Sequence, residues 1–192
     1  NARKKAVWFH GENLWWLFRT RDFIPEYDKI YCVSEPVRKQ VIARFPELAD
    51  RTEVLLNFID TKQVQRRSEE PLSDPQYTGE LKFLTVGRVS EEKGYDIAVQ
   101  ITAELKKRGL RFKWFIIGDG RDLNKLRTMA KEYQVEQEII FLGMRENPAP
   151  YVKSCDLYLQ PSRHEGYPIT IVEARSLQKV IIASDIPSMR EQ

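Results

Sequence analysis

The second half of the chain alternates between two kinds of hydrophobic pattern. Short runs rich in β-branched and aromatic residues are separated by longer stretches in which apolar residues recur every three or four positions. This alternation is typical of βαβ units that build a parallel sheet. The short runs predict strands at 81–87, 112–118, 138–143, 155–162 and 180–185, and the longer stretches predict helices at 95–109, 121–134, 147–154 and 168–178. The predicted fold class is α/β with a doubly wound parallel sheet.

The first 59 residues repeat the pattern on a smaller scale. They predict strands at 4–10, 29–35 and 51–59, with helices at 12–20 and 36–45. Residues 60–80 are polar, contain Pro71 and Pro75, and show no clear periodicity, which predicts a linker. The predicted organisation is the C-terminal part of one α/β domain (1–59), the linker (60–80) and a second, doubly wound domain (81–192). The chain starts without methionine and stops just after a strand-like run, so we expect it to be a fragment of a longer protein.

Composition narrows the possible functions. Lys and Arg total 31 against 28 Asp and Glu, and a net charge of +3 is too small for a general attraction to nucleic acid. Cys32 and Cys155 lie in apolar runs without metal-ligand spacing, which predicts buried free thiols in a reducing compartment. The longest apolar runs fall short of the ~18 residues that predict a membrane span.

In an open parallel sheet, ligands bind outside the carboxyl ends of the strands, so residues that directly follow each strand are the candidates. The turn after the first strand of the second half, GRVSEEKG, contains Gly87, Arg88 and Lys93. Cations at both ends of such a turn suit a diphosphate, although a surface turn with two solvated charges fits equally well. The next strand ends at Gly118 in a Gly-Asp-Gly turn, but Leu123 stands where a dinucleotide-binding fingerprint needs glycine.

The next two turns add further candidates. Gly143 and Met144 follow the third strand and offer backbone groups to the edge of a flat base. The stretch RHEGYPITIVEA, residues 163–174, carries Glu165 and Glu173 eight positions apart around a Gly-Tyr-Pro turn. Such a turn lets both carboxylates border one cavity, and each can accept hydrogen bonds from a sugar diol. The free N–H groups where a helix begins at Pro168, together with Gly166, favour bound anionic or hydroxyl oxygens.

These residues resemble the retaining family-4 glycosyltransferases, which have the two-domain GT-B architecture. The resemblance rests on FLTVGRVSEEKGYDIAV, FIIGDG, IIFLG and DLYLQPSRHEGYPITIVEA, in that order. It implies that Arg88 and Lys93 hold the donor diphosphate, that Glu165 faces the transferred sugar and that Glu173 holds the ribose. The remaining donor-binding positions that it implies are Gly87, Gly118, Gly143, Met144, His164, Gly166, Tyr167, Pro168 and Ile169. His164 is also compatible with a merely solvated loop position.

The resemblance further implies a function and its setting. The expected activity is transfer of a hexose from a UDP- or GDP-linked donor to a glycan or lipid-linked acceptor, with retention and without a metal or other cofactor. The expected location is the cytoplasm, at the inner face of the membrane, in polysaccharide biosynthesis. One alternative is a non-catalytic subunit that binds nucleotide sugars for a partner chain. A glycoside hydrolase that uses Glu165 and Glu173 as acid and base is disfavoured, because it leaves Arg88 and Lys93 without a role.

Overall fold

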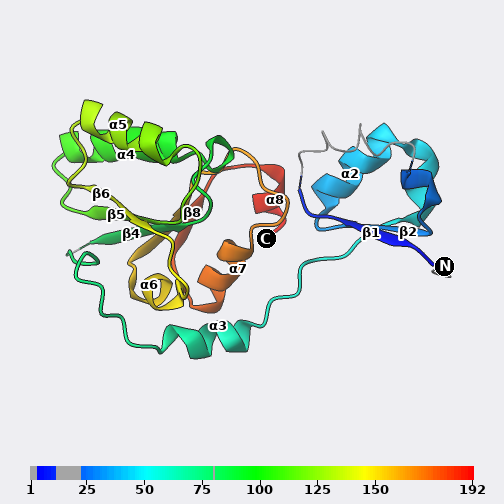
Figure 1. Cartoon of the computed structure of the whole chain (residues 1–192), viewed down its shortest axis with the longest axis horizontal. Coiled ribbons are helices and arrows are strands. Elements are labelled where there is room, and N and C mark those ends of the chain that lie inside the picture. The colour runs from blue at the N-terminus through cyan, green and yellow to red at the C-terminus, as the bar shows by residue number, and fades with distance from the viewer. Residues whose placement is uncertain (1–3, 12–22, 80) are drawn as a thin grey trace. The chain divides into compact units, whose positions relative to one another are not determined.

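A computed structural model of the chain describes residues 4–11, 23–79 and 81–192. Contacts divide it into two compact units. The first comprises Asn1–Phe58, His164–Pro168 and Asp185–Gln192, and the second comprises Ile59–Arg163 and Ile169–Ser184. The predicted helix at 12–20 lies outside the described residues. Both units are visible in Figure 1.

The first unit is built on a three-stranded parallel sheet in the order β1-β2-β3, formed by Ala6–Phe9, Lys29–Cys32 and Thr52–Val54. Helix α2, Glu35–Arg44, begins where the Ser34 hydroxyl caps the N–H of Val37 at 3.4 Å. Its buried side chains pack on Phe9 and other core residues of the sheet. The short helices are η1 (Ile24–Glu26), η2 (Pro46–Arg51) and α8 (Pro187–Arg190).

The second unit contains a five-stranded parallel sheet in the order β6-β5-β4-β7-β8. This order confirms the predicted doubly wound sheet, because the connections proceed outward in both directions from β4. The strands are β4 (Lys82–Val86), β5 (Lys113–Ile117), β6 (Ile139–Gly143), β7 (Leu157–Gln160) and β8 (Ile181–Ala183). The helices are α3 (Thr61–Ser68), α4 (Tyr95–Lys107), α5 (Leu123–Glu132), α6 (Ala149–Ser154) and α7 (Ile169–Ser176), with η3 at Glu91–Lys93.

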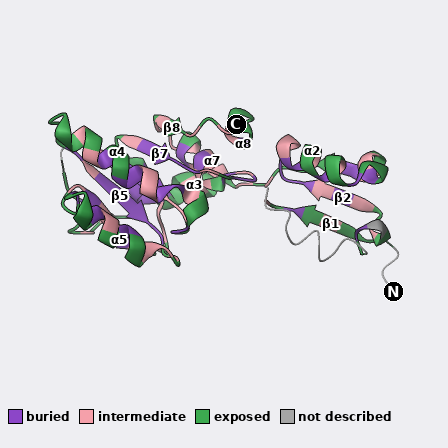
Figure 2. Ribbon diagram, turned by 90° about the horizontal axis from the view of Figure 1, so that it is seen from above, coloured by how far each residue is buried: buried purple, intermediate pink, exposed green. Residues whose placement is uncertain are grey.

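Alternate residues of the central strands pack into two separate layers of the second unit. Phe83, Trp114 and Ile116 join one core cluster with residues of α4 and α5. Phe115 has the opposite orientation and contacts the ring of Tyr77, with 4.5 Å between centroids. Figure 1 shows α4 and α5 on one side of the sheet and α6 and α7 on the other, and in Figure 2 β5 is largely in the colour of buried residues. Burial on both faces explains why these strands read as continuous apolar runs.

The prediction for the cysteines is confirmed, and one segment differs from its prediction. Cys32 and Cys155 are free and buried, and burial raises the pKa of both thiols to about 11. Helix α4 ends at Lys107, and Gly109 beyond it has φ of +79°, in the left-handed region typical of a glycine that terminates a helix. The segment predicted as a linker, however, contains helix α3, which begins where Asp60 accepts a 2.9 Å hydrogen bond from the N–H of Gln63. Among the described residues no helix is long and apolar enough to cross a membrane.

One buried hydroxyl joins three strands in the middle of the second unit. The indole N–H of Trp114 on β5 donates to the Thr85 hydroxyl of β4 at 2.9 Å. That hydroxyl donates in turn to the carbonyl of Leu159 on β7 at 2.7 Å. Thr85 is fully buried, so water cannot replace either hydrogen bond.

We therefore expect Thr85→Val, which keeps the side-chain shape, to lower the free energy of unfolding by about 2–3 kcal/mol. The Trp114 N–H would lose its acceptor in a buried position. Urea denaturation followed by circular dichroism measures the change. Thr128→Val is a matched control, because the Thr128 hydroxyl bonds to the Asn124 carbonyl on the exposed side of α5. A loss for Thr85→Val no larger than for the control would contradict the bridging role.

Candidate functional site

The candidate site lies where the sheet of the second unit changes its winding direction. Strands β4 and β7 are neighbours in the sheet, but their connections run to opposite sides. In doubly wound sheets ligands bind outside the carboxyl ends of two such strands, which here lead into residues 87–94 and 161–163. The first of these segments carries Arg88 and Lys93, and a phosphate site there stays a prediction.

Backbone hydrogen bonds tie the loops after β4, β5 and β6 together. The N–H of Gly87 donates to the carbonyl of Ile117, and the N–H of Gly118 donates to the carbonyl of Gly143, both at 2.9 Å. Gly118 has φ of +147°, and a Cβ built on it would lie 1.9 Å from the Gly87 carbonyl oxygen. A side chain at position 118 would therefore push the loops apart, and three of the predicted site glycines form one close-packed edge.

The two predicted cations differ in their surroundings. Arg88 is exposed, and within the part of the chain that the structure describes it makes no hydrogen bond or ion pair. Lys93 is half-buried, and its Cε lies 3.9 Å from where a Cβ on Gly87 would be. The aliphatic stem of Lys93 thus lies along Gly87, so both cations belong to one turn around that glycine. Tyr95 fixes the turn by donating to the Gly87 carbonyl at 3.0 Å.

Arg163, which the sequence analysis did not single out, joins the segment after β7 to the turn after β4. Its guanidinium forms two 2.6 Å hydrogen bonds with the carboxylate of Asp96 in the first turn of α4. Its backbone N–H donates to the Glu92 carbonyl at 2.8 Å. Gly94 packs so closely that a Cβ on it would meet the Pro161 carbonyl oxygen at 1.9 Å. The turn with Arg88 and Lys93 is therefore held against the end of β7.

The ion pair makes a pH-dependent contribution to stability. Hydrogen bonds from Arg163, opposed by partial burial and helped by its charge, hold the pKa of Asp96 below its ordinary value. A folded-state pKa below the unfolded value of ~3.9 means that the contribution is complete above about pH 4 and is lost as the pH falls through the folded-state pKa.

Asp96→Asn should accordingly lower the free energy of unfolding by about 1 kcal/mol at pH 7, a value reduced for the partial solvent exposure of both side chains. At pH 3 and below, the difference between wild type and variant should shrink. Urea denaturation at both pH values measures it. An equal loss at both would show that the charge of Asp96 contributes nothing.

The second predicted carboxylate lies on helix α7. Glu173 is half-buried, and burial raises its pKa, while the nearby charge of Arg67 on α3 acts in the opposite direction. Ile169 is the first residue of α7 and is 43% exposed. Met144, at the carboxyl end of β6, is 71% exposed, and Gly143 before it has φ of +75°. These positions all belong to the second unit.

The other predicted site residues, 164–168, belong to the first unit. Glu165 is 7% exposed, and Tyr167 packs against the core of that unit. Gly166 and Pro168 are buried, whereas His164 is exposed. Because Glu165 and Glu173 fall in different units, a cavity shared by both carboxylates stays a prediction. Within the described residues, no three His, Cys, Asp or Glu side chains gather as metal ligands would.

Comparison with known proteins identifies the fold and the family. The solved structure of Anabaena Alr3699/HepE in complex with UDP and glucose superposes with a TM-score of 0.82 and 17% identity, covering 98% of this chain and 55% of that chain. The α/β units and parallel sheets are those of the GT-B glycosyltransferase fold. Residues 67–192 match the family of glycosyl transferases group 1, so the chain belongs to that family.

Curated relatives agree with the family. An uncharacterized glycosyltransferase of Methanocaldococcus jannaschii is 29% identical over 165 residues, which cover 83% of this chain and 40% of that protein. The N-acetylgalactosamine-N,N'-diacetylbacillosaminyl-diphospho-undecaprenol 4-alpha-N-acetylgalactosaminyltransferase of Campylobacter jejuni is 25% identical over 162 residues, covering 84% of this chain and 42% of that protein. The chain thus spans less than half the length of these two relatives.

Proposed function

We propose that the protein is a retaining glycosyltransferase of family 4, which transfers a hexose from a nucleotide-diphosphate sugar to a glycan or lipid-linked acceptor. The observation that carries the proposal is the turn after β4, in which Arg88 and Lys93 lie beside Gly87 and which Arg163 holds against the end of β7. The family match, and UDP in the Anabaena complex, support a nucleotide-sugar donor. The Campylobacter relative, named for a lipid-diphosphate acceptor, supports a lipid-linked acceptor.

In this proposal the donor diphosphate binds at the turn that carries the two cations. Arg88 offers a planar fork of N–H donors and Lys93 a point charge, which together suit adjacent phosphoryl groups. The two sugar hydroxyls of the ribose bond to the carboxylate of Glu173, which accepts but cannot donate when ionised. Gly143 and Met144 approach the base, and Glu165 with residues 166–169 orients the hexose.

The chemical step breaks the bond between the anomeric carbon and the phosphate oxygen. The bonding electrons leave with the diphosphate, whose growing negative charge Arg88 and Lys93 stabilise. The acceptor hydroxyl oxygen bonds to the same face of the anomeric carbon, and its proton passes to the departing phosphate oxygen. Glu165 positions the hexose during this exchange. Since protein cations neutralise the diphosphate, we propose that the reaction uses no metal. We further propose that it takes place on the cytoplasmic side of a membrane.

The first test measures donor binding by isothermal titration with UDP, GDP, ADP and their hexose conjugates. We expect one base series to bind, and Arg88→Ala and Glu173→Ala to weaken it about tenfold or more each, as loss of a charge-assisted hydrogen bond predicts. Arg108→Ala is the matched control for Arg88→Ala, because Arg108 is an exposed arginine that pairs with Glu104 at the end of α4. Unchanged affinity in both site variants would overturn the assignment.

A second measurement separates transfer from mere binding. Turnover by the protein without added subunits would exclude the alternative of a non-catalytic binding subunit. The anomeric proton coupling of the product, read by nuclear magnetic resonance, reports retention or inversion. An inverted product would contradict the proposed family-4 assignment while leaving the donor site intact.

A further inference from the structure

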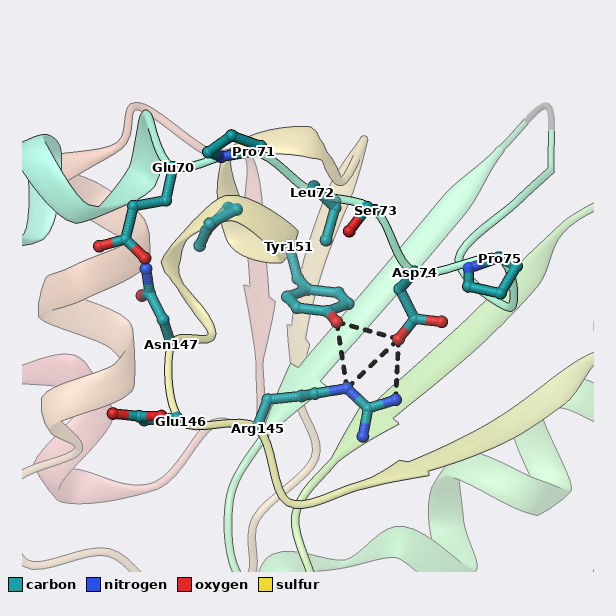
Figure 3. A pocket seen from close by; sticks show the side chains of 11 residues that line it. Glu70, Pro71, Leu72, Ser73, Asp74, Pro75, Arg145, Glu146, Asn147 and Tyr151 are labelled. Carbon is teal, nitrogen blue, oxygen red and sulfur yellow. Dashed lines mark hydrogen bonds and ion pairs between the residues drawn. The ribbon is translucent and has the colours of Figure 1, made fainter.

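The segment between residues 69 and 79 contributes a carboxylate that is almost buried in the second unit. The Oδ2 atom of Asp74 accepts hydrogen bonds from Tyr151 Oη at 2.9 Å and from Arg145 Nη2 at 2.7 Å, and Arg145 Nε lies 3.2 Å away. Its other oxygen accepts the N–H of Gln76 at 2.9 Å. The side chain is only 10% exposed. Figure 3 shows the three side chains converging beside a cavity of about 410 Å³.

Arg145 extends this cluster to the loop that follows β6. Its Nη1 donates to the carbonyls of Leu142 and of Met144, the latter at 3.1 Å. These two carbonyls flank Gly143, which has φ of +75°. The guanidinium therefore joins the carboxylate of Asp74 to the backbone on both sides of the loop's tightest residue. Nearly all N–H groups of the Arg145 guanidinium donate to these partners, so the role of Arg145 is to fix the loop.

A second pair of hydrogen bonds holds the same loop from α3. Arg67 Nη2 donates to the carbonyl of Glu146 at 2.9 Å. The side-chain amide of Asn147 donates to the carbonyl of Arg67, also at 2.9 Å. Residues 67 and 74 thus both contact the loop 142–147, although Arg67 precedes Glu146 by 79 positions and Asp74 precedes Arg145 by 71. The segment 67–74, which lies between the two sheets in the sequence, therefore holds this loop in place.

Charge strengthens the cluster. Although burial acts to raise it, hydrogen bonds from Arg145, the Gln76 N–H and Tyr151 hold the pKa of Asp74 below its usual range. Asp74 is therefore ionised at neutral pH, and its bonds to Arg145 are charge-assisted. Met144, by contrast, is 71% exposed at the tip of the loop. Arg145 therefore holds the backbone of the loop, while the side chain of Met144 stays exposed. A surface that recognises a flat ligand needs such a fixed and accessible backbone.

We propose that Asp74 is a positioning residue that sets base selectivity, by fixing through Arg145 the loop that approaches the nucleotide base. The inference rests on the proposed function, in which the nucleotide base binds next to Gly143 and Met144. In this proposal Asp74 acts on the donor only through Arg145 and the loop. Its substitution should release the loop, so that binding free energy is spent on ordering it again and discrimination between bases weakens.

The experiment compares dissociation constants for UDP, GDP and ADP in wild type, Asp74→Asn and Arg145→Met. We expect the affinity for the preferred nucleotide to fall about tenfold in each variant and the affinities for the other two to change less than threefold. If the residues act as one unit, the double variant should lose no more selectivity than Arg145→Met alone. Glu104→Gln is the matched control, since it removes an exposed carboxylate–arginine pair on α4.

The outcomes separate the two proposals. Wild type that binds no nucleotide would overturn the donor site and this inference with it. Equal weakening for all three nucleotides, or none, in a wild type that does bind would overturn the positioning role alone. Should Asp74→Asn fail to fold, Tyr151→Phe removes the hydrogen bond to the same carboxylate and the one that the Tyr151 hydroxyl accepts from Arg145 Nε at 3.0 Å. It must then reduce selectivity in the same direction by about two- to threefold, and unchanged selectivity would contradict the inference.

Discussion

The pairing of β4 with β7 is the constraint on which the rest of the second unit depends. Strand β4 lies between β5 and β7, and the two connections that leave it and its neighbour run to opposite faces of the sheet. The change of winding direction exists only because these two strands are adjacent. Thr85 reinforces the adjacency from inside, since its hydroxyl accepts from β5 and donates to β7. The turn with Arg88 and Lys93 consequently packs against the end of β7.

Arginines of the second unit fall into two groups with different physical roles. Arg163 and Arg145 are bonded to carboxylates and carbonyls, and they hold loops in place. Arg88 is exposed and has no such partner among the described residues, so its charge is available to an anion. The distinction matters because a guanidinium engaged on all sides cannot reorganise around a ligand, whereas it can supply the rigidity that ligand binding needs.

Helix α3 shows what the hydrophobic pattern missed and what signal was present. Its sequence TKQVQRRS has one large apolar residue, so periodicity gave no indication of a helix. The capping signal was nevertheless there, with Asp60 three positions before Gln63, and the structure uses it. Helix α3 is stabilised by packing against α6 and α7, which a local pattern cannot reveal. Such contacts make this polar segment part of the second unit.

By itself, the sequence determined the elements and the chemical groups. The alternating short and long apolar patterns and the two cysteines in apolar runs depend only on nearby residues, and the predictions made from them are confirmed. Only the tertiary structure decided the partners. Arg163 pairs with Asp96 across 67 positions, and Arg145 pairs with Asp74 across 71. Charged side chains are common on loops, and the local sequence does not distinguish a solvated arginine from one that binds a distant carboxylate. The difference depends on which loops the strand order brings together.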